Sequence, residues 1–108
     1  MSKKIEFEYQ NKSYCLEYNR DAIKWMESQG FNYSEFVKKP ITMSEIAFQG
    51  AFVMNHKNIR MAEIQEIYES LADKTVLNTT LLEMVQETID DLYSDKKEDG
   101  KNVGWKVV

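Results

Sequence analysis

Apolar and polar residues alternate in two short segments near the N-terminus, 5–9 and 14–18. A two-residue period places successive side chains on opposite faces of a strand. The polar residues 10–13 separate the segments, so the pattern predicts an antiparallel β-hairpin. Its expected inner face consists of Ile5, Phe7, Tyr9, Tyr14, Leu16 and Tyr18. Because two strands alone are marginally stable in water, we expect helices to cover that face.

After the hairpin the apolar spacing changes to steps of three and four residues, which is the period of a helix. A first helix is expected over 20–29, with Asn19 as its N-cap and Gly30 as its C-terminal stop. A short second helix is expected to follow Asn32. It should end before Pro40, because a residue that precedes proline avoids helical backbone angles.

A third helix is predicted from Met43 to about His56, because residues 42–45 match a capping box. Apolar residues occur on most of its sides, which is typical of a central helix surrounded by neighbours. Gly50 lies inside this segment and costs about 1 kcal/mol relative to alanine. We therefore expect a close backbone contact at that glycine.

Two amphipathic helices are expected in the last third of the chain, over about 61–71 and between Lys74 and Tyr93. The apolar stripe of the earlier helix is Ile64, Ile67, Tyr68 and Leu71. The stripe of the later helix is Leu82, Val85, Ile89 and Leu92, widened by Leu77, Leu81 and Met84. The start of the later helix stays open, because Asp73 and Asn78 are both suitable caps.

These elements predict an α+β fold that is mainly α: an N-terminal antiparallel hairpin packed on a bundle of four or five helices. The hairpin and the helices form one domain over residues 1–93. Residues 94–108 begin with mixed charge and low hydrophobicity, so we expect a flexible tail. That tail ends in Trp105 and two valines, which have no core of their own.

Composition and charge narrow the classes of function. A length of 108 residues with 43% hydrophobic residues suits one ordinary globular domain. The formal net charge of -4 provides no basic field, so we expect neither nucleic acid nor a membrane as a partner. The N-terminal residues contain no apolar segment of signal-peptide length, and a single cysteine cannot form an internal disulfide. We therefore expect the protein in the cytoplasm.

Candidate catalytic residues are few. Cys15 and His56 could form a nucleophile and base with Asn55 or a carboxylate as orienter, so a small cysteine hydrolase stays open as an alternative. The simpler interpretation is a strand residue at the rim and a histidine at a helix C-terminus. Acidic residues cluster at 63–69 and 90–99, but without the spacing of a calcium loop. We expect no enzyme activity, no metal site and no cofactor.

The pattern favours a protein that acts through its surfaces. The third and fifth helices carry more apolar residues than a small hairpin and one neighbour need. Core packing explains this most simply; the alternative is a partner-binding or self-association surface along the fifth helix, with the tail as a docking peptide. The expected partner-contact residues are Phe52, Met54, Ile89, Leu92, Tyr93 and Trp105.

Several short segments occur in a particular order along nearly the whole chain. They are 5–9 with Tyr14 and Leu16, then 25–31, 48–52, 55–57 and 66–71, a late acidic stretch, and 102–105. In this order and spacing they resemble the tail assembly chaperones, small proteins encoded in the tail-gene region of siphophages and prophages of Gram-positive bacteria.

The resemblance implies a non-enzymatic chaperone of virion assembly in the cytoplasm of a bacterial host. Such a chaperone coats the long helical tape measure protein, keeps it soluble and is displaced as tail tube subunits polymerise around it. The resemblance also implies a longer form made by translational frameshifting, of which this chain would be the short form. Homo-oligomers are an open expectation. The alternative is a small acidic adaptor or inhibitor, such as an antitoxin, that binds a basic partner.

Overall fold

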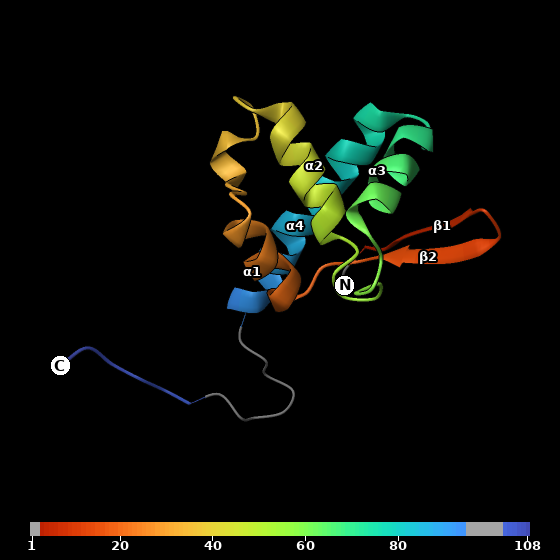
Figure 1. The fold of residues 1–108 in the computed structure, drawn as a ribbon. Helices are drawn as coiled ribbons and strands as arrows, with labels where there is room; N and C mark the ends of the chain where they lie inside the picture. The colour runs from red at the N-terminus through yellow and green to blue at the C-terminus, as the bar shows by residue number, and fades with distance from the viewer. Residues whose placement is uncertain (1–2, 95–102) are drawn as a thin grey trace.

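The structure is a computed structural model that describes residues 3–94 and 103–108. Its elements are β1 (Ile5–Tyr9), β2 (Lys12–Leu16), α1 (Arg20–Ser28), the 3₁₀ helix η1 (Tyr33–Glu35), α2 (Pro40–Gly50), α3 (Met61–Ser70) and α4 (Lys74–Tyr93). The fold is α+β and mainly α, as the sequence predicts. In Figure 1 the helices form one group, and the hairpin extends from it with the turn projecting beyond α3.

The hairpin is closed by a two-residue turn, which is shorter than the polar run 10–13 indicates. Gln10 and Asn11 have φ angles of 50° and 63°, as a type I′ turn requires. The register places Phe7 opposite Tyr14, and the two rings stack with centroids 5.3 Å apart. Tyr14 and Leu16 are buried, whereas the inward side chains of β1 are only half-buried. The core therefore holds the hairpin mainly through β2.

α1 begins and ends as predicted. The Asn19 side chain accepts a hydrogen bond from the Ala22 amide at 2.8 Å, and Gly30 takes a φ angle of 102° just after the helix. The predicted second helix is only the single 3₁₀ turn η1, which Asn32 caps. Val37, expected inside that helix, lies beyond it and is 89% exposed.

α2 differs from its predicted bounds at both ends. It starts at Pro40, because proline at the first helical position has a preset helical φ and needs no amide partner. The predicted capping box is therefore not used, and Ser44 is buried inside the helix. At the other end the Phe52 amide bonds the Gln49 carbonyl three residues back, so the last turn tightens and the chain leaves the α-helix before His56.

α3 and α4 occupy nearly the predicted ranges. Asp73 precedes α4 with a φ angle of 53° and makes no side-chain cap bond, so it redirects the chain without capping the helix. The buried face of α4 consists of Leu81, Met84, Val85 and Thr88. Leu82 and Ile89 from the predicted stripe are only half-buried. Thr88 can be buried on this face because its hydroxyl donates to the Met84 carbonyl at 2.9 Å.

α2 is the central helix and packs against α1, α3 and α4. A Cβ atom at Gly50 would overlap Cγ and Sδ of Met26 on α1, so the predicted close contact at this glycine is confirmed. Before α1 begins, the buried Tyr18 hydroxyl donates to the Ala47 carbonyl of α2 at 2.6 Å. Burial raises the pKa of Tyr18, so its hydroxyl stays a donor.

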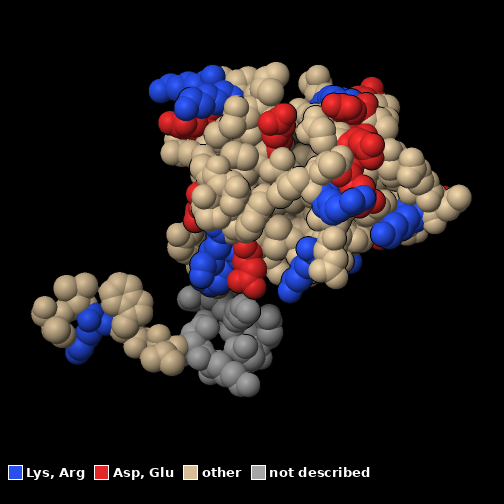
Figure 2. All heavy atoms as spheres, viewed as in Figure 1, with Lys and Arg blue, Asp and Glu red and all other residues tan. Residues whose placement is uncertain are grey.

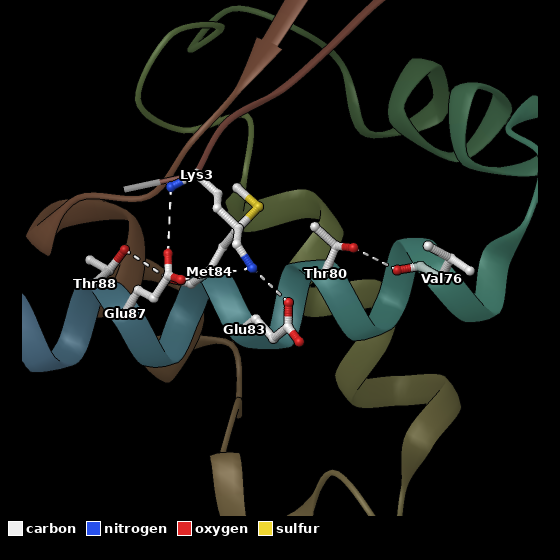
Figure 3. A network of polar contacts seen from close by, with 7 residues as sticks. All are labelled: Lys3, Val76, Thr80, Glu83, Met84, Glu87 and Thr88. Carbon is white, nitrogen blue, oxygen red and sulfur yellow. Dashed lines mark hydrogen bonds and ion pairs between the residues drawn. The ribbon is translucent and has the colours of Figure 1, made fainter. Parts of the chain in front are cut away.

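Lys3, which precedes β1, lies beside the middle of α4. Lys3 Nζ is 2.8 Å from Glu83 Oε1 and 3.8 Å from Glu87 Oε2, as Figure 3 illustrates. The hydrogen bond to Glu83 raises the pKa of Lys3. These side chains are one-third to one-half exposed, so solvent screens the ion pairs. The contacts therefore orient the N-terminal residues more than they stabilise the fold.

The contact between Gly50 and Met26 generates a stability prediction. Gly50→Ala is expected to lower the free energy of unfolding by about 1–3 kcal/mol, because the added methyl group overpacks the α1–α2 crossing. In Gly50→Ala/Met26→Ala the shortened Met26 side chain leaves room, so the double variant should lose less than the sum of the single losses. Urea denaturation measures all three values.

Gly104 supplies the control, because a Cβ added there would meet nothing within 4 Å. Gly104→Ala is expected to change stability by less than about 0.5 kcal/mol. Strict additivity of the Gly50 and Met26 losses would contradict the proposed contact.

Candidate functional site

The six partner-contact residues predicted from the sequence do not lie on one surface of the structure. Phe52 is 1% exposed, with its ring edge-on to Phe48, so the expectation of an exposed contact is wrong for this residue. It is buried because the chain leaves α2 in a tight turn that directs the ring into the core. Met54 lies in the connection between α2 and α3 and is 38% exposed. Trp105 is 85% exposed in residues 103–108, which have no regular structure; the rest of the predicted tail, 95–102, lies outside the described residues.

The other three predicted residues lie together. Ile89, Leu92 and Tyr93 line one side of a groove of about 200 Å³ between α1 and the last turns of α4. The side chains from α1 are Arg20, Ile23, Lys24 and Glu27. We call this site the α1–α4 groove. Its apolar surface runs from buried Ile23 to Tyr93, which is 86% exposed.

Helical spacing produces this arrangement. Ile89, Leu92 and Tyr93 are separated by three and four residues, so they share one face at the end of α4. On α1 the residues at 20, 23, 24 and 27 follow the same spacing. Ile23 is buried against the core, whereas Arg20 and Lys24 at the rim are exposed. The groove therefore has an apolar floor and charged edges.

The size of the α1–α4 groove limits what it can bind. Pockets for small molecules usually enclose roughly 300–1,000 Å³. A groove of about 200 Å³ with one open side suits a few apolar side chains of a protein better than a cofactor. Arg20, Lys24 and Glu27 place both signs of charge at its rim, which favours an amphipathic helix as the occupant.

A second hollow, which the sequence did not predict, lies between α1 and the connection that follows α2. It has a volume of about 210 Å³, and its apolar lining includes Trp25, Val53, Ile59 and Met61. Met61 is 51% exposed. Ile59 was a usable signal, because a large apolar residue in a polar connection needs a neighbouring surface to cover it.

The three residues of the hydrolase alternative are brought together. The Cys15 amide donates to His56 Nε2 at 3.1 Å, and Asn55 Nδ2 donates to the Cys15 carbonyl at 3.1 Å. Asn55 Nδ2 also lies 2.8 Å from Glu17 Oε2. The His56 side chain thus accepts the hydrogen bond of the Cys15 amide. Together, the side chains of His56 and Asn55 provide partners for the outward amide and carbonyl of Cys15 on β2.

The electrostatic surroundings of Cys15 do not favour a nucleophile. Partial burial raises the pKa of the Cys15 thiol, and the carboxylates of Glu17 and Glu6 raise it further. A nucleophilic cysteine needs the opposite shift, because the thiolate is the reactive form. The contacts between Cys15 and His56 therefore support a structural role.

Three further features of the described residues concern metal binding, membranes and surface charge. Within 3–94 and 103–108, no three His, Cys, Asp or Glu side chains gather closely enough to hold a metal ion. None of the helices in this part of the chain has the length and apolar character of a membrane span. Figure 2 shows acidic and basic side chains interspersed over the visible face, without a broad patch of one sign.

The raised pKa of Cys15 predicts slow reaction with thiol reagents. At pH 7.5 the folded chain should react with iodoacetamide more slowly than the urea-unfolded chain, because less of the Cys15 thiol is ionised in the folded state. The difference should shrink as the pH rises and the folded thiol ionises. Faster reaction of the folded chain would restore the hydrolase alternative.

The acceptor role of His56 predicts a local effect. His56→Ala should speed hydrogen exchange at the Cys15 amide about tenfold or more, because a lost hydrogen bond of about 1.4 kcal/mol changes the opening equilibrium by that factor. Asn55→Ala is the matched control, since it removes the partner of the Cys15 carbonyl and leaves the amide bonded. Unchanged exchange in His56→Ala would show that His56 does not hold this amide.

Comparison with known proteins identifies a family and no relative of established function. No curated protein and no solved structure matches this chain. Residues 1–108 match a family described as a domain of unknown function, DUF5055. Because the match covers the full length given, the chain belongs to the DUF5055 family.

Proposed function

We propose that this chain is a tail assembly chaperone, which binds the tape measure protein of a phage tail and helps recruit tail tube subunits. The order of the sequence segments suggests this role. The observation that carries it in structural terms is the α1–α4 groove, where Ile89, Leu92 and Tyr93 leave an apolar stripe uncovered beside Ile23. A protein that acts by shielding another protein needs such a stripe.

The chemistry of the groove suits a helical partner. A tape measure protein exposes apolar helical stripes until the tail tube covers them. Two or three side chains from such a stripe fill the available volume, while Arg20, Lys24 and Glu27 contact polar residues beside the stripe. The charged rim then sets the orientation of the partner more than its affinity.

The small size of the groove also suits a reversible role. Interfaces that bury less than about 1,200 Å² are usually weak and transient. A chaperone displaced by tail tube subunits must dissociate readily, and a long partner can be covered by many copies that each bind weakly. The proposed mechanism therefore needs no energy source beyond the competing assembly of the tube.

Co-expression with the tape measure protein encoded near this gene tests the proposal. The expected result is a soluble complex that migrates together in size exclusion. Leu92→Glu should weaken the complex at least tenfold, because the carboxylate removes an apolar contact worth roughly 1.5–3 kcal/mol. Binding is measured by diluting the purified complex and recording the concentration at which it dissociates, for the parent chain and for the variant.

Val76→Glu is the matched control, because Val76 also lies on α4, is 64% exposed and does not line the groove. This variant should bind like the parent chain. A tape measure protein that stays insoluble while this chain elutes alone would contradict the chaperone proposal and favour the adaptor or inhibitor. Equal weakening by both variants would remove the groove from the proposal.

A further inference from the structure

The two outer edges of the hairpin differ. On β2, the Cys15 amide and carbonyl point outward and are bound by His56 and Asn55. The Glu17 amide bonds the Ala51 carbonyl at 3.3 Å. The residues that follow α2 thus cover the edge of β2 in place of a third strand.

The outer edge of β1 is uncovered. Because Cys15 bonds outward, the pair Glu6 and Cys15 is a non-hydrogen-bonded pair of the ladder, so the Glu6 amide and carbonyl also point outward. The alternation gives Glu8 the same orientation. Within the described part of the chain, no hydrogen bond reaches these backbone groups. An open edge of this kind is a template for another strand.

The C-terminal residues Val103–Val108 match this edge in pattern and charge. Val103, Trp105 and Val107 alternate with other residues and are 85–87% exposed. In a strand they share one face, as the half-buried Ile5, Phe7 and Tyr9 do on β1. Lys106 then lies on the face of Glu6 and Glu8, which gives opposite charges on neighbouring strands.

We propose that the outer edge of β1 binds residues Val103–Val108 of a second copy of this chain as a third strand. In the single chain both surfaces are uncovered, and Figure 1 shows the C-terminal residues on the side of the domain opposite to the hairpin turn. Reciprocal exchange forms two such strands in one closed dimer with two-fold symmetry. The proposal is independent of the tail-assembly role, because it uses neither the α1–α4 groove nor a phage partner.

Sedimentation equilibrium of the full chain tests the dimer. The expected result is a monomer–dimer equilibrium that Glu8→Pro weakens at least tenfold, because proline removes an outward amide that the incoming strand needs. Ser13→Pro is the matched control, since it makes the same change on the outer edge of β2 and should leave the dimer intact. Circular dichroism confirms that both variants are folded.

A carbodiimide, which joins amines to carboxylates, tests the occupant in a mixture of ¹⁴N-labelled and ¹⁵N-labelled chains. Linked peptides that join Lys106 to Glu6 or Glu8 and carry one isotope from each chain support the exchange. Linked peptides within single chains only would show that the segment closes on its own β1 and would overturn the proposal. A chain that stays monomeric at all concentrations, or a dimer that Glu8→Pro leaves unchanged, would overturn it equally.

Discussion

α1 and α2 cross closely at Gly50, and this crossing fixes the place of α1 in the domain. Met26 occupies the space where any other residue at position 50 would carry a side chain. The buried hydrogen bond from Tyr18 to the Ala47 carbonyl attaches the segment before α1 to the same helix. Because α2 also packs against α3 and α4, the position of α1 relative to the whole domain follows from this crossing. A displacement there would move every surface that α1 helps to form.

Both proposed binding surfaces, the α1–α4 groove and the outer edge of β1, lie at the periphery of this core. α1 places Ile23 beside the last turns of α4 and leaves Leu92 and Tyr93 exposed. The hairpin is held through β2, so β1 is left with half-buried side chains and an open edge. The outer edge of β2 differs, because polar contacts from His56 and Asn55 cover it. The molecule therefore combines a well-packed core with an apolar groove and an open strand edge, which is consistent with reversible protein binding.

Most elements of the fold were predictable because local signals and the core agree. The alternation over 5–9 predicted a strand, Asn19 predicted a helix cap, and Gly50 predicted a close contact. The structure contains all three. The start of α2 was mispredicted because two start signals compete, proline at the first helical position and the capping box, and the helix uses the proline. The burial of Phe52 was not predictable, since it depends on how the chain turns after Gly50. Of the predicted contact residues, the spacing of Ile89, Leu92 and Tyr93 indicated a shared face, but the groove itself also requires α1, which no pattern on α4 reveals.

A methyl NMR titration of the isotope-labelled chain with the tape measure protein tests most directly whether the α1–α4 groove contacts this partner. The proposed contact predicts that the methyl signals of Ile23, Ile89 and Leu92 shift, while those of Ile59, in the second hollow, stay in place. Shifts confined to Ile59 and its neighbours, or no shifts at a saturating concentration of the partner, would contradict it.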